Sequence, residues 1–213
     1  MTGRSPRYRH LDELRQSHRS RRHALQDRLT EFAHRDPADY FYELVYCLLT
    51  PQSAALRAGH VVEVLRTLPA DCPVEEIATV LRNKSTYVRF HNTKAARIVE
   101  ARANFPAIAA RLAQGGSPPA LREWLVQNVK GLGWKEASHF LRNIGCRNLA
   151  ILDRHILKNL KHHGVLASLP RTLTRGRYLA VERSFAGFAD AVGIPMDEMD
   201  LLFWSRETGV LLK

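Results

Sequence analysis

A Gly-x-Gly turn at residues 131–133, directly before a helix-forming stretch, is the feature that most constrains the fold of this chain. Apolar residues recur at helical spacing on both sides of it, in residues 120–128 and 134–143. The sequence therefore predicts two helices joined by a tight hairpin. The first amides of the second helix have no partner within that helix and lie at the positive end of its dipole. This turn is predicted to bind a phosphate through its backbone N–H groups.

Lys135 lies in the first turn of the second predicted helix, where the dipole disfavours an ammonium. The neutral amine is the form of lysine that acts as a nucleophile. Asp153 follows in the chain and would supply a carboxylate to the same site, although the helix-forming residues 154–160 after it also make it a candidate N-cap. A lysine, a carboxylate and a phosphate-binding turn together indicate covalent chemistry on DNA.

The charge of the chain indicates a polyanionic partner. The net charge is +11 and the pI about 10.1. Of the 32 basic residues, 25 are arginines, whose planar guanidinium binds phosphate through two hydrogen bonds at once. Nucleic acid is the partner that this composition favours, and an anionic membrane surface is the lesser alternative.

No segment has the length and apolar character of a membrane span, since the most apolar run covers only residues 44–56. Residues 1–10 are basic and lack the apolar centre of a secretion signal. The cysteines are few and widely separated, which fits neither a disulfide framework nor a four-cysteine iron–sulfur site: Cys47, Cys72 and Cys146. An intracellular protein is expected.

Helical periodicity dominates the chain, and no Asn-Gly or Asp-Gly hairpin with alternating strands is present. The sequence thus predicts an all-α fold. Asp36 is expected to start one helix and the Asn92-Thr93 segment to cap another. The expected helices are 11–33, 36–50, 53–68, 74–81, 92–103, 105–114, 120–128, 134–143, 154–163, 173–192 and 197–204.

The hairpin and the segments after it resemble the helix–hairpin–helix DNA glycosylase superfamily. The resemblance rests on residues 130–145, 150–157 and 204–213. The pattern is most similar to the short, mainly archaeal and bacterial (type 2) branch of the 8-oxoguanine DNA glycosylase/AP lyases. It extends over most of the chain from Asp39 onward and is weakest in the first thirty residues.

This resemblance implies an all-α fold of two lobes with the active site in the cleft between them. Residues 36–147 would form the helical bundle that carries the hairpin, and residues 1–35 and 148–213 the second lobe. The missing cysteine cluster implies a member without an iron–sulfur cluster, and no cofactor is required. In relatives the hairpin carbonyls hold a monovalent cation. One polypeptide suffices for the active site, so a monomer is expected.

By the same resemblance, Lys135 is the nucleophile and Asp153 its acidic partner. The amine would attack C1′ of the damaged nucleotide, and the resulting Schiff base allows β-elimination of the 3′ phosphate. The carboxylate would stabilise positive charge on the sugar. Backbone amides near Gly131 and Gly133 would bind the DNA backbone. Lys130, just before the turn, is the rival amine.

A base inside a duplex must be flipped out before C1′ can be attacked, and side chains then fill the gap. Gln52 falls where relatives place a residue that enters this gap. Arg89 and Phe90 resemble a second wedge, in which the phenyl ring would stack on the estranged base. Without the resemblance, Gln52 would be an ordinary polar residue at a helix start, and Phe90 an ordinary core residue.

Three further residues are candidates for recognition of the flipped base. His139 lies one turn beyond Lys135, although a core histidine would explain it equally well. Trp204 offers a stacking face. Lys213 brings an ammonium and the chain-end carboxylate, which would accept the N7–H that distinguishes 8-oxoguanine from guanine, whereas a frayed terminus is the alternative.

The resemblance therefore implies a bifunctional glycosylase and AP lyase that acts on double-stranded DNA containing 8-oxoguanine. Two alternatives remain open from the sequence. One is a glycosylase for an oxidised pyrimidine. The other is a non-catalytic helix–hairpin–helix DNA-binding protein, which would need the basic surface and the turn but neither Lys135 nor Asp153.

Overall fold

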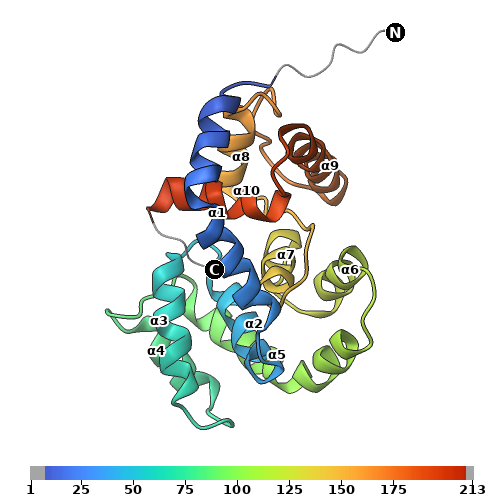
Figure 1. The fold of residues 1–213 in the computed structure, drawn as a ribbon. Helices are drawn as coiled ribbons and strands as arrows, with labels where there is room; N and C mark the ends of the chain where they lie inside the picture. The colour runs from blue at the N-terminus through green and yellow to red at the C-terminus, as the bar shows by residue number, and fades with distance from the viewer. Residues whose placement is uncertain (1–7, 210–213) are drawn as a thin grey trace. The chain divides into compact units, whose positions relative to one another are not determined.

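The computed structural model describes residues 8–209, which contain helices and no strand (Figure 1). The all-α prediction is confirmed. No helix in this described part is long and apolar enough to cross a membrane. In chain order the elements are α1 Leu11–Ala33, the 3-10 helix η1 Pro37–Asp39, α2 Tyr40–Leu49, α3 Ala55–Arg66, α4 Val74–Arg82, α5 His91–Ala113, α6 Pro118–Asn128, α7 Trp134–Asn143, α8 Arg154–His162, α9 Arg175–Val192 and α10 Met196–Thr208.

The chain divides into two compact units. Within the described residues, one joins residues 8–34 to residues 141–209, and the other spans residues 35–140. The second division lies inside α7, whereas the sequence places its domain boundary at residue 148. The last turn of α7 belongs with α10 because Arg142 donates to Asp200 Oδ1 at 3.0 Å, and both side chains are buried.

The unit of residues 35–140 is built around α2, whose residues from Leu44 to Leu49 are all buried. A helix that is apolar on every side must be covered on every side. Here α3 and α5 pack against α2, and α4 packs against both of them. The wedge segments, the hairpin and Lys135 are all carried by this unit.

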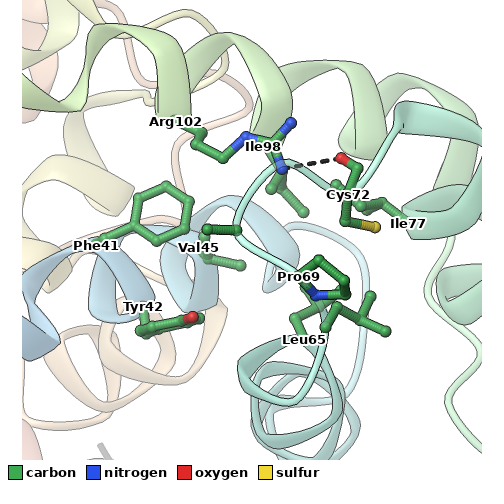
Figure 2. Close-up of a pocket in the computed structure, with 11 residues that line it drawn as sticks. Phe41, Tyr42, Val45, Leu65, Pro69, Cys72, Ile77, Ile98 and Arg102 are labelled. Carbon is green, nitrogen blue, oxygen red and sulfur yellow. Dashed lines mark hydrogen bonds between the residues drawn. The ribbon is translucent and has the colours of Figure 1, made fainter.

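An apolar pocket of about 160 Å³ opens in the same unit (Figure 2). Phe41 and Val45 of α2 and Ile98 of α5 contribute to its wall, and Arg102 donates to the Cys72 carbonyl at 2.9 Å across it. None of the residues that line it is a predicted site residue. The pocket is therefore separate from the candidate active site.

In the other unit, α10 packs against α1, α8 and α9. Helix α1 buries Leu14, Leu25, Leu29 and Phe32, whereas Leu11, which has the same helical spacing, is only partly buried. His18 of α1 also hydrogen-bonds Glu198 of α10 at 2.5 Å. The outer face of α1 carries exposed arginines beside exposed acidic residues, so charges of both signs are mixed on it.

Several predicted helix starts differ from the structure by one to four residues, and two of these lie beside predicted site residues. Helix α3 begins at Ala55 and not at Ser53, because residues 50–53 form a turn. Helix α5 begins at His91 with Phe90 as its N-cap and no side-chain cap, so the Asn92-Thr93 cap is not formed. The two helices expected over residues 92–114 are one continuous helix, which contains Pro106.

Candidate active site

Helices α6 and α7 form the predicted hairpin, and a buried arginine holds them together. Arg122 of α6 donates from Nη1 to Ser138 Oγ of α7 at 3.1 Å. Its guanidinium also lies 4.9 Å from the ring centroid of Trp134 in the first turn of α7. At the turn itself, the Leu132 amide donates to the Val129 carbonyl at 3.1 Å, and both side chains are buried.

The glycines of the turn are held by their surroundings. Gly131 has φ +91°, and a Cβ there would lie 2.5 Å from Cδ of Arg97. Neither the Gly131 nor the Gly133 amide has a hydrogen-bond partner among residues 8–209. These amides border an open groove of about 560 Å³ lined by Arg97, Glu100 and residues 126–133. Such a concave row of donors at a helix start suits a phosphate.

Lys135 occupies the first turn of α7 with about a quarter of its side chain exposed. Its Nζ lies 3.0 Å from Oε1 of Glu136. The other oxygen of Glu136 lies 2.9 Å from where a Cβ on residue 133 would stand, so Gly133 leaves room for this carboxylate. Sequence reasoning missed Glu136, because an acidic residue in a first helical turn is ordinary.

Lys130, the rival amine, is in a different environment. Its side chain is 72% exposed and its Nζ lies 3.5 Å from Oε2 of Glu100. It lies before the first turn of α7, among the residues that line the groove. The geometry therefore favours Lys135 over Lys130 as a nucleophile.

Asp153 is the N-cap of α8, as the alternative interpretation of the sequence holds. Its Oδ1 accepts the Ile156 amide at 2.8 Å. Its Oδ2 has no hydrogen-bond partner within the described residues. The cap fixes the direction of the carboxylate and leaves one oxygen for another contact. A capping role and a chemical role are thus compatible.

Asp200 is a second acid, and it lies close enough to Asp153 for the charge of Asp153 to affect its pKa. Burial raises the pKa of Asp200 to about 7, and the negative charge of Asp153 contributes in the same direction, while Arg142 opposes it. The ion pair with Arg142 does not offset the loss of solvation.

Gln52 is exposed, at the third position of a turn closed by the Ser53 amide on the Thr50 carbonyl at 3.1 Å. Its φ is +54°, and Pro51 precedes it, the combination found in a type II turn. Glycine or asparagine is usual at this position because a side chain in the left-handed conformation costs about 1–2 kcal/mol. The chain holds a glutamine there at that cost.

Phe90 also has left-handed backbone, with φ +61°. Its ring is 49% exposed and lies 5.1 Å from the guanidinium carbon of Arg89. The alternative of an ordinary core phenylalanine is therefore wrong. Of the non-glycine residues with positive φ in the described part of the chain, two are the residues proposed as wedges, Gln52 and Phe90; the others are His10 and Asn148. Strain of this kind gathers at functional sites.

The candidates for base recognition are less alike. His139 is buried, with its ring edge-on to Tyr46 at a centroid distance of 5.6 Å. Trp204 lies on α10 and is partly exposed. Lys213 lies outside the described residues.

The structure brings Lys135 and the turn of residues 50–53 to a common neighbour that the sequence did not reveal. Lys94 of α5 donates to the Pro51 carbonyl of that turn and to the carbonyl of Leu49, the last residue of α2. Burial, together with the charges of Arg97 and Lys135, lowers the pKa of Lys94 to about 8. Nothing in the sequence distinguishes Lys94 from a solvated lysine at a helix start.

Known relatives match the chain over most of its length. A sequence model described as 8-oxoguanine DNA glycosylase matches residues 25–194. The 8-oxoguanine DNA glycosylase/AP lyase of Fusobacterium nucleatum is 43% identical over 183 residues, which is 82% of each chain. That of Korarchaeum cryptofilum is 40% identical over 193 residues, covering 90% of this chain and 91% of the relative.

Solved structures agree with the sequence matches. The 8-oxoguanine DNA glycosylase of Thermotoga maritima superimposes with a TM-score of 0.85 at 34% identity, covering 95% of this chain and 98% of the other. The Methanocaldococcus jannaschii 8-oxoguanine glycosylase/lyase in complex with a 15mer DNA containing 8-oxoguanine gives a TM-score of 0.85 at 32% identity, covering 95% and 99%. With the hairpin and its lysine in place, these matches show that the chain belongs to the helix–hairpin–helix family of 8-oxoguanine DNA glycosylases.

Proposed function

We propose that this protein excises 8-oxoguanine from double-stranded DNA and then nicks the strand, as a glycosylase and AP lyase. The observation that carries the proposal is the position of Lys135. Its side chain, about a quarter exposed, is in the first helical turn after a hairpin whose Gly131 and Gly133 amides are available to a phosphate. The names of the relatives, 8-oxoguanine DNA glycosylase/AP lyase, support the same activity.

The chemistry begins with the neutral amine of Lys135. A bond forms between Nζ and C1′ as the bond from C1′ to the base breaks, and the base leaves with the electron pair and takes up a proton. The sugar ring then opens to a Schiff base. Loss of a proton from C2′ expels the 3′ phosphate, which is the β-elimination step, and hydrolysis of the Schiff base releases the lysine.

Asp153 acts on the sugar in this scheme. Positive charge develops at C1′ as the base leaves, and a fixed carboxylate oxygen stabilises it. The hydrogen bond from the Ile156 amide to Oδ1 keeps the group oriented, and Oδ2 makes the contact. The cap thus serves the chemistry by removing rotational freedom.

Gln52, Arg89 and Phe90 fill the gap left by the flipped base. Their support is exposure and strained backbone in the same unit as Lys135. The phenyl ring stacks on the estranged base, and Gln52 enters the stack with its amide. Arg89, whose guanidinium packs on the Phe90 ring, contributes positive charge beside the backbone.

Recognition of the base is proposed for Trp204, which stacks on it, with His139 and Lys213 supplying polar contacts. The hairpin would hold a monovalent cation through carbonyl oxygens. The Lys130 and Leu132 carbonyls accept no hydrogen bond from residues 8–209, so they fit such an ion, which would strengthen phosphate binding. The protein is proposed to act as a monomer on the genomic DNA of a prokaryote.

A lesion panel tests the function. Duplexes carrying a single 8-oxoguanine, thymine glycol or guanine are incubated with the protein, and both base release and strand cleavage are measured. The proposal expects release and β-elimination only at 8-oxoguanine. Activity confined to thymine glycol would identify an oxidised-pyrimidine glycosylase. Tight binding without base release from any duplex would identify a non-catalytic DNA-binding protein.

A further inference from the structure

Lys94 is a buried lysine that the proposed chemistry leaves without a role. Its side chain is 2% exposed, and its Nζ donates to the Leu49 carbonyl at 2.6 Å and the Pro51 carbonyl at 2.7 Å. A third contact, to Ser53 Oγ, measures 3.2 Å. An ammonium has three hydrogens to donate, and these acceptors account for all of them. With so little exposure, Lys94 is placed to hold neighbouring groups and not to attack a substrate.

All three acceptors lie at or beside the turn that presents Gln52. They flank it on both sides, since Leu49 and Pro51 precede the residue and Ser53 follows it. A turn with a glutamine in the left-handed conformation relaxes unless other contacts hold it. Lys94 supplies such contacts through the carbonyls, whose directions are set by the dihedral angles of the turn.

Ser53 extends the network to the second wedge segment. Its Oγ also accepts the Arg89 amide at 3.2 Å, across 36 residues of chain. The Phe90 carbonyl in turn accepts the Lys94 amide at 2.9 Å. The Lys94 side chain therefore bonds residues on both sides of Gln52, and Ser53 links that side chain to the Arg89 amide beside Phe90. The bond from the Lys94 amide to the Phe90 carbonyl is the first backbone bond of α5.

We propose that Lys94 is a positioning residue that locks the two gap-filling segments, residues 50–53 and 89–90, in one fixed arrangement. This inference rests on the proposed function, because it assumes that Gln52 and Phe90 enter the gap. The two activities should therefore depend on Lys94 to different degrees. Flipping the base and holding it out of the helix requires the fixed arrangement of both segments. Nicking of an abasic site, which already lacks its base, requires it much less.

The test compares Lys94→Met with Lys84→Met, which removes the same charge from an exposed position in the same unit. Single-turnover rates at saturating enzyme are measured on 8-oxoguanine duplex and on duplex with a preformed abasic site. Lys94→Met is expected to slow base excision about 10- to 100-fold, as misplacement of a positioned group does, and to slow abasic nicking much less. Lys84→Met is expected to leave both rates unchanged.

Ser53→Ala is the milder variant, which keeps both carbonyl contacts of Lys94 and folds even if Lys94→Met does not. It cuts the link to Arg89 and is expected to slow excision several-fold, again with little effect on abasic nicking. Equal loss of both activities in the two variants, or wild-type excision in either one, would overturn the positioning role.

A second measurement separates this proposal from the function beneath it. A duplex with 2-aminopurine opposite a tetrahydrofuran abasic analogue reports stacking on the estranged base without any reaction. The fluorescence change on binding is expected to depend on Phe90 and Gln52, and to shrink in Lys94→Met. A change that Phe90→Ala and Gln52→Ala leave intact would remove the wedge assignment and the role of Lys94 with it. If the wild-type protein forms no adduct that borohydride can trap, the lysine chemistry is overturned instead.

Discussion

The Nζ of Lys135 lies 3.0 Å from Oε1 of Glu136, its neighbour in the first turn of α7. Lys135 is the residue proposed as the nucleophile, so in the proposed mechanism its amine must leave this ion pair to reach C1′.

Glu136→Gln tests this contact. Without the carboxylate, the Lys135 amine is no longer held in an ion pair, so Schiff-base trapping on abasic DNA should be about two- to fivefold faster. Glu100→Gln, which removes the carboxylate beside Lys130, is the matched control and should leave the trapping rate unchanged. A trapping rate in Glu136→Gln equal to that of the wild type would contradict a restraining role for the ion pair.

Substitutions of Asp153 separate its cap from its chemistry. Asp153→Asn keeps a capping oxygen, so its thermal stability should stay close to wild type, while excision falls about 10²–10³-fold with the charge. Asp153→Ala should lose the activity and also about 1 kcal/mol of unfolding free energy. Melting curves and single-turnover rates give both quantities. An active Asp153→Asn would reduce this residue to a cap.

Gln52→Gly should be more stable and less active than the wild type. Glycine relieves the left-handed strain but loosens the unfolded chain, so unfolding free energy should rise by about 0.5–1 kcal/mol. Excision of 8-oxoguanine should fall because nothing fills the gap. Gln114→Gly, at a residue with φ −64°, serves as the control and should lower stability. Urea denaturation measures both variants. A destabilised Gln52→Gly would show that the turn carries no strain.

The raised pKa of Asp200, about 7, predicts a pH-dependent stability. Between about pH 4 and 7 the folded protein keeps a proton on Asp200 that the unfolded chain releases. The free energy of unfolding therefore falls as the pH rises through this range. The unfolding free energy of the wild type minus that of Asp200→Asn should therefore fall from pH 5 to 7 and level off above pH 8. Asp200→Asn also removes the ion-pair partner of Arg142, which shifts this difference by an amount that does not change with pH.

Denaturation at several pH values measures this difference. Asp190→Asn, at an exposed carboxylate in the same unit, is the control and should show no such slope. A difference between wild type and Asp200→Asn that is flat from pH 5 to 8 would mean that Asp200 is ionised in the folded protein throughout.

Helix existence could be predicted from the sequence because apolar periodicity is a local signal. Helix α1 has the predicted bounds, and the hairpin between α6 and α7 was evident from two glycines. The starts of α3 and α5 were missed because neither helix has a side-chain cap. Left-handed backbone occurs at Phe90, the N-cap of α5, and at Gln52, two residues before the N-cap of α3. That strain is maintained by contacts distant in the chain, which no local pattern contains.

Some residues of the candidate site could likewise be predicted from the sequence, and others could not. Lys135 stands out because a lysine is unusual in the first turn of a helix, whereas Gly131 and Asp153 stand out through the family resemblance that covers them. Lys94 and Glu136 do not, since a lysine and a glutamate near helix starts are common. Their importance follows from burial and from partners more than forty residues away in the case of Lys94. Only the folded structure brings these groups together.

The central claim is that Lys135 is the amine that attacks C1′. Borohydride trapping on a duplex with a single 8-oxoguanine tests it most directly, comparing wild type, Lys135→Gln and Lys130→Gln. The account predicts a covalent adduct with wild type and Lys130→Gln and none with Lys135→Gln, which should still bind the tetrahydrofuran duplex. An adduct that persists in Lys135→Gln, or that disappears in Lys130→Gln, would contradict it.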